Sequence, residues 1–240
     1  GMFALAIWDG VEQRLLLARD RMGVRPLYYW AGPACVLFAS EIAPLFRAPW
    51  LRRELDRESV EPFLAYRYVP GAATLFRGIR RLPPGHLLEW RAGKTEIRPW
   101  WRLPDPPERN LTPGAAREEF LALLRDAVRL RTESDVPVGA YLSGGLDSTA
   151  VTALLAREGT GKLHTFSLGF GSGIDELEQA RATSRFLSTE HHEVVMRSED
   201  LDLLPECVAR LDDPVGDLIV LPMYLLSRLV AKQGKVVLSG

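Results

Sequence analysis

The sequence predicts an α/β chain whose N-terminal part is α+β. From residue 136 onward, short apolar runs alternate with helical patterns, which is typical of a doubly wound parallel sheet with helices on both faces. The first hundred residues instead hold closely spaced apolar runs separated by turn residues such as Asp9-Gly10. That spacing indicates hairpins in antiparallel sheets.

The N-terminal half is expected to contain five strands and two short helices. Residues 2–8 are apolar throughout, so we expect a buried strand there. The strands are predicted at 3–8, 14–18, 26–30, 35–39 and 86–90, and the helices at 40–46 and 59–66.

Residues 102–113 hold four prolines among charged and polar residues, which makes this segment the best candidate for a linker. A helix should follow, with Thr112 as its N-cap and Pro113 at its first position. We therefore divide the chain into domains 1–105 and 106–240. In the second domain we predict strands at 136–142, 163–169, 192–196 and 235–238, and helices at 149–157, 175–187, 199–211 and 221–232.

Composition excludes several classes of function. Lys and Arg number 30 against 31 Asp and Glu, for a formal net charge of -1, so no bulk field favours nucleic acid or an anionic membrane. The apolar runs are too short to span a bilayer, and the start lacks the basic region of a signal peptide. Cys35 and Cys207 lie far apart, which fits a reducing, cytoplasmic compartment.

Both ends of the sequence fall at expected core strands. We therefore expect a fragment from the middle of a longer protein. The alternative is a short chain with swapped or frayed edge strands.

The most informative motif follows the predicted strand 136–142 and precedes a helical pattern. Glycines let the backbone approach a phosphate closely, and the N–H groups of a first helical turn point at the anion. An aspartate beside a polyphosphate is repulsive unless a cation lies between them, which suggests Mg²⁺. The alternative is a capped turn in which Ser and Asp start the helix. The motif is Ser143-Gly144-Gly145-Leu146-Asp147-Ser148.

Two other glycine-rich segments are interpreted as loops. Residues 159–162 resemble the tail of a Walker A loop, but Leu163 stands where Ser or Thr belongs. Residues 169–173 fail as a dinucleotide fingerprint, because Ile174 replaces the third glycine or alanine.

Three further features are given structural interpretations. The adjacent His191 and His192 should point to opposite faces of a strand and not share an ion. Trp100-Trp101 is interpreted as a packing pair. A solvated acidic loop is the preferred interpretation of the segment containing Asp212, Asp213 and Asp217, with substrate contact as the alternative.

The chain resembles the glutamine-dependent asparagine synthetases along nearly all of its length. In the N-terminal half, the similar segments are Gly1-Met2-Phe3-Ala4-Leu5-Ala6-Ile7-Trp8-Asp9, Leu17-Ala18-Arg19-Asp20-Arg21-Met22-Gly23-Val24-Arg25-Pro26-Leu27-Tyr28-Tyr29, Phe38-Ala39-Ser40-Glu41-Ile42 and Leu82-Pro83-Pro84-Gly85-His86. In the second half they are Ser134-Asp135-Val136-Pro137-Val138-Gly139, the Ser143–Ser148 motif, Leu221-Pro222-Met223-Tyr224-Leu225-Leu226-Ser227-Arg228 and Val236-Val237-Leu238-Ser239-Gly240.

The resemblance implies two domains and one overall reaction. The first would be part of an N-terminal-nucleophile glutaminase with two antiparallel sheets between helices. The second would be the start of an adenine-nucleotide-binding domain of the PP-loop type. In this family, ATP and Mg²⁺ activate aspartate as an acyl-adenylate with release of pyrophosphate, and ammonia from glutamine then forms asparagine and AMP. The expected partners are these small molecules and, in the full-length protein, a second subunit of a homodimer.

The resemblance also implies which residues bind ATP and pyrophosphate. Asp147 would in addition be a ligand of Mg²⁺. The implied positions are Leu142, Ser143, Gly144, Gly145, Asp147, Ser148, Leu168, Ser239 and Gly240.

The chain departs from the family pattern at its ends. No cysteine stands at its start, and Cys35 and Cys207 match no nucleophile position. The family's glutamine-binding residues lie upstream of Gly1, and its second magnesium ligand lies beyond Gly240. We therefore expect no complete catalytic set and neither glutaminase nor synthetase activity in this fragment, so measurable glutamine hydrolysis would contradict us. Two alternatives remain open: a same-fold amidotransferase or β-lactam-type synthetase acting on another carboxylic acid, and a catalytically silent nucleotide-binding scaffold.

Overall fold

The computed structural model describes residues 1–105, 110–158, 161–171 and 175–239. The chain divides into two compact units. The first comprises Gly1–Pro107 together with Val208–Asp217, and the second comprises Glu108–Cys207 together with Leu218–Gly240. No helix among the described residues combines the length and the apolar character that crossing a bilayer requires.

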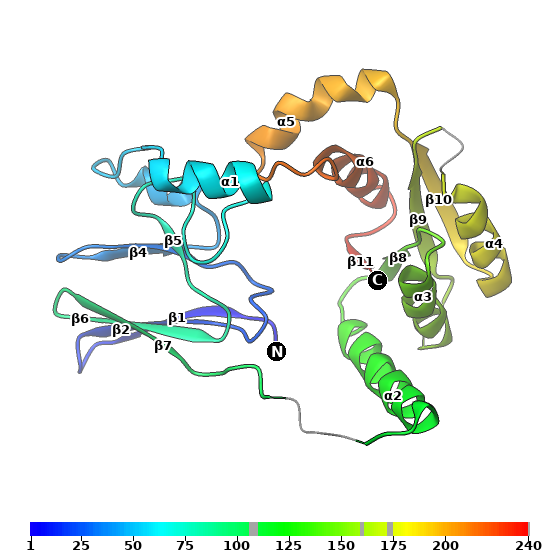
Figure 1. The fold of residues 1–240 in the computed structure, drawn as a ribbon, viewed down its shortest axis with the longest axis horizontal. Helices are drawn as coiled ribbons and strands as arrows, with labels where there is room; N and C mark the ends of the chain where they lie inside the picture. The colour runs from blue at the N-terminus through cyan, green and yellow to red at the C-terminus, as the bar shows by residue number, and fades with distance from the viewer. Residues whose placement is uncertain (106–109, 159–160, 172–174, 240) are drawn as a thin grey trace. The chain divides into compact units, whose positions relative to one another are not determined.

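The first unit contains two antiparallel sheets (Figure 1). One sheet has the order β1-β2-β6-β7, with strands Ala4–Asp9, Arg14–Arg19, His86–Arg91 and Lys94–Pro99. The other has the order β4-β3-β5, with strands Val36–Ala39, Tyr28–Ala31 and Arg80–Arg81.

The core of the first unit lies between these sheets. Leu17 on β2, Tyr29 on β3 and Leu88 on β6 belong to one buried cluster. Each side chain points from its strand toward the other sheet, as alternate residues of a strand do. A second cluster packs the short 3₁₀ helix η1 (Ala43–Arg47) against the smaller sheet through Ile42 and Leu45. The helix expected at 59–66 begins as the 3₁₀ helix η2 (Arg57–Ser59) and continues as α1 (Val60–Tyr66).

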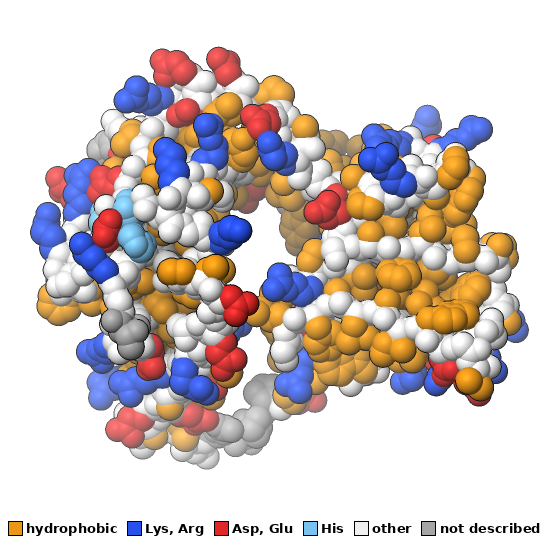
Figure 2. Space-filling model, turned by 180° about the vertical axis from the view of Figure 1, so that it is seen from behind, with side chains coloured by type: hydrophobic (Ala, Val, Ile, Leu, Met, Phe, Trp, Pro, Cys, Tyr) orange, Lys and Arg blue, Asp and Glu red, His pale blue; other side chains and the backbone are white. Residues whose placement is uncertain are grey.

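Strand β1 corrects the expectation of a buried strand at residues 2–8. Its middle residues are exposed, with Ile7 53% and Trp8 52% accessible. Of this edge strand, only Ala4 packs against the buried cluster of the unit, so the side chains that follow it are left uncovered. Figure 2 shows hydrophobic side chains gathered on the surface of this unit.

A buried aspartate organises the loop after β2. The carboxylate of Asp20, which is 1% exposed, accepts hydrogen bonds from the backbone N–H groups of Met22, Val24 and Arg25 at 2.9–3.1 Å. Burial raises the pKa of Asp20, but these N–H groups outweigh that effect and hold the pKa below its usual value. The side chain thus fixes the backbone of the loop that leads to β3.

The second unit is built on one parallel sheet of order β10-β9-β8-β11. Its strands are Glu190–Val195, His164–Gly169, Val138–Tyr141 and Val236–Leu238. One face packs against α2 (Pro113–Arg131), α3 (Leu146–Glu158) and α4 (Leu177–Leu187), and the other packs against α6 (Val220–Val230) (Figure 1). This arrangement confirms the predicted fold class, in which antiparallel sheets precede a doubly wound parallel sheet.

Helix boundaries in this unit reflect local chemistry. Thr112 caps α2 as expected, since its hydroxyl accepts a hydrogen bond from the Ala115 N–H at 3.3 Å and Pro113 follows it. The single helix expected at 199–211 is instead the 3₁₀ helix η3 (Ser198–Leu203) followed by α5 (Leu204–Ala209). Pro205 lies in the first turn of α5, where its missing N–H and fixed φ favour a helix start.

The acidic segment at 212–213 is not a solvated loop, which corrects that expectation. Asp212 accepts a hydrogen bond from the Ile42 N–H at 2.9 Å. Asp213 accepts one from the Leu75 N–H at 3.3 Å and pairs with Arg81 at 2.8 Å, with side-chain exposures of 11% and 22%. Burial raises the pKa of Asp213, against the opposing effects of the Leu75 N–H and Arg81. Both carboxylates hold the 208–217 segment to the rest of the first unit.

We predict that Asp213→Ala destabilises the chain by about 1–3 kcal/mol, because it removes the only described carboxylate partner of the partly buried Arg81 guanidinium. Urea unfolding monitored by circular dichroism measures the change. The matched control is Asp126→Ala, which removes an exposed pair with Arg129 and should change stability by less than about 1 kcal/mol. Equal effects of the two substitutions would contradict the structural role given to Asp213.

Candidate functional site

The parallel register brings the carboxyl ends of three strands to one edge of the sheet. Tyr141, the last residue of β8, lies beside Phe166 of β9, and Leu238, the last residue of β11, lies beside Ala140. The pairing continues past β8, where the Leu142 N–H donates to the Phe166 carbonyl at 2.9 Å. From β8 the chain adds β9 and β10 on one side of the sheet and later adds β11 on the other side. The carboxyl end of β8 is therefore the topological switch point, where open α/β sheets bind ligands.

The segment after β8 is a loop held by its own two serines. The Ser148 hydroxyl accepts a hydrogen bond from the Ser143 N–H at 3.2 Å and lies 2.9 Å from the Ser143 hydroxyl. The Ser143 hydroxyl in turn accepts a hydrogen bond from the Gly145 N–H at 3.2 Å. Ser148 is 8% exposed, so in this structure its hydroxyl braces the loop from inside.

Gly144 occupies a conformation and a space that favour glycine. Its φ is +85°, and a Cβ built there would lie 2.7 Å from the Gln179 Cβ and 3.0 Å from the Ala180 backbone nitrogen of α4. The missing side chain therefore lets the loop lie directly against the next helix.

The loop ends at the first turn of α3, which begins at Leu146 and not at the expected residue 149. The N–H of Thr149 donates to the Gly145 carbonyl at 3.1 Å. The N–H groups of Leu146, Asp147 and Ser148 donate to no acceptor within the part of the chain that the structure describes. Such groups, together with the helix dipole, give the turn an affinity for anions.

A cavity of about 350 Å³ opens beside this loop, within the second unit. Its floor is formed by the ends of β8 and β9, and α6 contributes one wall. The lining residues are Tyr141, Leu142, Ser143, Phe166, Ser167, Leu168, Phe170, Asp175, Glu176, Leu177, Ile219, Pro222, Met223 and Leu226. Of the Ser143–Ser148 motif, Ser143 lines this cavity, so the loop begins at the edge of an open crevice.

The structure brings most of the candidate residues together. Leu142, Ser143 and Leu168 line the cavity. Gly144, Gly145, Asp147 and Ser148 lie in the adjoining loop and first helical turn, with the Asp147 side chain exposed. Ser239 follows β11 at the same sheet edge but is not among the described lining residues, and Gly240 lies outside the described residues.

Sequence reasoning missed the acidic wall of the cavity. The sequence predicts Asp175 only as the first residue of a helix. In the structure it lines the cavity, and its carboxylate accepts hydrogen bonds from the Phe170 and Gly171 N–H groups at 2.6 and 2.8 Å. Its position six residues beyond the end of a predicted core strand, next to Glu176, is the signal that could have indicated it. Asp175 thus fixes the backbone of Phe170 and Gly171, directly after β9.

The fold and the site define a class: an α/β protein with a half made of two antiparallel sheets, followed by a parallel-sheet half with a glycine turn at its carboxyl edge. Comparison of the sequence with known families agrees with both halves. Residues 1–101 match the glutamine amidotransferase domain, and residues 119–240 match the asparagine synthase family. The chain belongs to the asparagine synthase family, which confirms the resemblance noted from its motifs.

Individual relatives are similar over the whole chain. An asparagine synthetase-named protein of Mycobacterium tuberculosis (strain ATCC 25618 / H37Rv) is 37% identical over 249 residues, covering 100% of this chain and 38% of that protein. The glutamine-hydrolyzing asparagine synthetase 1 of Bacillus subtilis (strain 168) is 33% identical over 248 residues, with the same two coverages. Amidase chyE of Penicillium rubens is 32% identical over 266 residues, again covering 100% and 38%.

The chain thus spans 38% of the length of these relatives. Among solved structures, the NH3-dependent NAD synthetase of Campylobacter jejuni matches with a TM-score of 0.38 and 19% identity, covering 50% of this chain and 54% of that one.

We predict that Gly144→Ala distorts the loop and lowers stability by about 1–3 kcal/mol, because the new methyl group meets α4 and φ is positive. Urea unfolding measures the loss. Gly114→Ala is the control, since it adds a methyl group in a helix where nothing lies within 4 Å, and it should be neutral or stabilising. Unchanged stability of the Gly144 variant would contradict this account of the loop.

Proposed function

We propose that this chain is part of an ATP-dependent amide ligase that converts aspartate to asparagine with nitrogen from glutamine. One observation carries the proposal: an open cavity at the carboxyl edge of a parallel sheet borders a glycine turn whose helical N–H groups have no protein acceptor. Membership in the asparagine synthase family supports this choice of chemistry. We also propose that the protein acts in the cytoplasm.

The loop would bind the phosphates of ATP. In this proposal the N–H groups at 146–148 and the exposed Ser143 hydroxyl face the pyrophosphate portion. Ser148, Gly144 and Gly145 would contribute by holding the loop in this shape. Leu142 and Leu168 would contact the nucleotide from the strand ends, with Ser239 and Gly240 closing around it. The apolar lining of the cavity would exclude water from the activated acid.

The donor set fits Mg²⁺ bound together with ATP. Asp147 supplies one exposed carboxylate in the first turn of α3, and Mg²⁺ favours one or two carboxylates combined with phosphate oxygens and water. The carboxylate oxygens of Asp175 already accept two backbone hydrogen bonds, so Asp147 is the better ligand. When bound, the ion would neutralise charge on the departing pyrophosphate.

The proposed reaction has two steps. The aspartate side-chain carboxylate attacks the α-phosphorus of ATP, which forms an acyl-adenylate and releases pyrophosphate. Ammonia derived from glutamine then attacks the acyl carbon, loses a proton and expels AMP. In this scheme the loop contributes by stabilising the charge that develops on pyrophosphate in the first step.

We expect the 240-residue chain to bind ATP in the presence of Mg²⁺, as measured by isothermal titration calorimetry. Asp147→Asn should weaken this binding by roughly ten- to a hundredfold, the loss of one charge-assisted contact of about 1.5–3 kcal/mol. Asp126→Asn, on the exposed surface of α2 in the same unit, is the matched control and should bind normally. Absence of ATP binding would contradict the proposed ATP site, whether the protein is a ligase or a catalytically silent nucleotide-binding scaffold.

We expect a protein that carries this chain at the full length of its relatives to release pyrophosphate from ATP only when aspartate is present. The amidase name of one relative supports a second candidate, a same-fold enzyme that activates a different carboxylic acid. A panel of carboxylic acids in a pyrophosphate-release assay separates the two. Release that does not depend on aspartate would contradict asparagine synthesis, and the acid that does support release would identify the substrate.

A further inference from the structure

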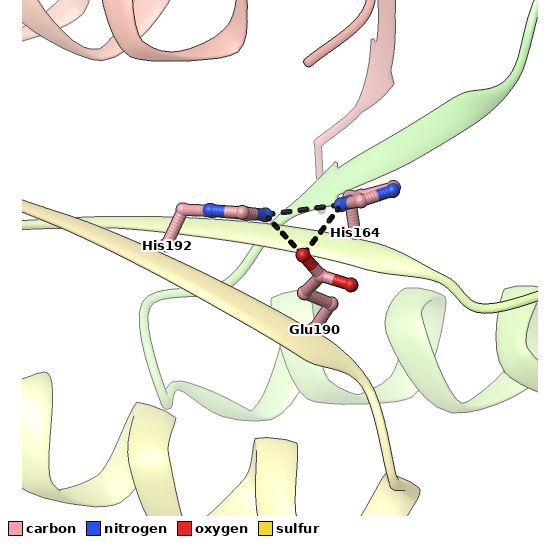
Figure 3. A group of neighbouring side chains, drawn as sticks. All are labelled: His164, Glu190 and His192. Carbon is pink, nitrogen blue, oxygen red and sulfur yellow. Dashed lines mark hydrogen bonds and ion pairs between the residues drawn. The ribbon is translucent and has the colours of Figure 1, made fainter. Parts of the chain in front are cut away.

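Two histidines and a glutamate converge at the opposite, amino edge of the same parallel sheet (Figure 3). His164 and Glu190 are the first residues of β9 and β10 and lie beside each other in the register. His192 is two residues beyond Glu190, so its side chain falls on the same face of β10. Within the residues that the structure describes, this is the one group of three such side chains spaced to hold a metal ion.

The distances between the donor atoms match a small cation site. The His164 Nδ1 and His192 Nε2 lie 3.0 Å apart, and the Glu190 Oε1 lies 4.0 Å from the first and 3.8 Å from the second. A tetrahedral Zn²⁺ with bonds of about 2.0–2.1 Å to nitrogen holds its donor atoms roughly 3.3 Å apart. Small side-chain rotations would therefore bring all three atoms within bonding distance of one ion.

The surroundings fix the rings and leave a position for solvent. The His192 ring stacks on Phe166 with centroids 5.1 Å apart and an interplanar angle of 21°, so its orientation is held by the sheet. Histidine side chains reach the surface of this unit in Figure 2, and none of the three donors is fully buried. A water molecule can therefore supply a fourth ligand, and an ion can enter without unfolding.

Two features compete with an ion at this place. Lys162 pairs with the Glu190 Oε2 at 3.3 Å, although this leaves the Oε1 directed at the histidines. The two imidazoles can also form a hydrogen bond with each other, in which one ring nitrogen donates and the other accepts. Metal binding would require the ring that donates this hydrogen to carry it on its other nitrogen instead.

We propose that His164, Glu190 and His192 bind a divalent transition-metal ion of the zinc class. Two imidazoles and one carboxylate are a common protein ligand set for Zn²⁺. The site would link β10, at the edge of the sheet, to its neighbour β9. None of the three donors lines the cavity at the carboxyl edge, although the His192 ring stacks on Phe166, which does, so metal binding and ATP binding are measured separately.

Equilibrium dialysis of the 240-residue chain against buffered Zn²⁺ tests the proposal. The chain should bind one equivalent, and His164→Asn and His192→Asn should lose it. The chain has four histidines, which provides matched controls. His86→Asn lies in the first unit, and His191→Asn lies on the other side of β10, where its Nδ1 is 2.9 Å from the Thr165 hydroxyl. Both controls should keep the ion.

A second variant and a second readout keep the test decisive if a histidine variant fails to fold. Loss of a residue that only supports a metal ligand typically weakens metal binding about 10- to 100-fold. Glu190→Gln removes a proposed ligand itself, so it should weaken Zn²⁺ binding by at least this factor. Zinc should also raise the urea midpoint of the wild type and of His191→Asn, because it binds only the folded state. The absorbance of the Co²⁺ form should lack a thiolate charge-transfer band. No bound Zn²⁺, retention by all three ligand variants, or a thiolate band from Cys35 or Cys207 would each overturn the proposal.

Discussion

The arrangement of the second unit depends on the close pairing of β8 between β9 and β11. Gly139, in the middle of β8, makes this possible: a Cβ there would lie 2.9 Å from the Phe166 ring and 3.0 Å from the His164 carbonyl. Because β8 has no side chain at this point, Phe166 packs across the sheet against Leu226 and Val230 of α6. The pairing in turn fixes where β8 ends, and therefore where Ser143 and the first turn of α3 begin.

The two edges of this sheet suit ligands of opposite charge. In a βαβ unit each helix begins near the carboxyl edge and ends near the amino edge, so the helix dipoles make the first edge favourable for anions and the second favourable for cations. The first turn of α3 adds N–H groups without protein acceptors at the carboxyl edge. At the amino edge α4 ends at Leu187, three residues before Glu190 begins β10. The phosphate and metal proposals therefore follow one electrostatic pattern.

Local signals made the carboxyl edge predictable, whereas pairings between distant residues could not be predicted. The apolar run at 136–142 and the glycines after it indicated a strand, a turn and a helix, and the structure has these elements with shifted ends. Strand β7 was missed because its sequence Lys94-Thr95-Glu96-Ile97-Arg98-Pro99 is charged, as suits an edge strand. The adjacent His191 and His192 do have partners on separate faces, but His164, 28 residues before His192, becomes its neighbour only through the register of β9 and β10.

The Asp212–Asp213 segment shows that contacts between distant residues also decide which parts of the chain form one compact unit. A linker rich in proline marks a change in composition near residue 105, but composition carries no information on a contact between Arg81 and a residue 132 positions later. The Arg81 guanidinium also donates to the carbonyls of Val69 and Ala73, at 2.7 and 2.8 Å, so it joins the backbone before β5 to the returning segment. A chain cut at residue 105 would keep those carbonyls and lose the only carboxylate paired with this guanidinium among the described residues. The partly buried Arg81 of the N-terminal half therefore takes its carboxylate partner from a short piece of sequence after Cys207.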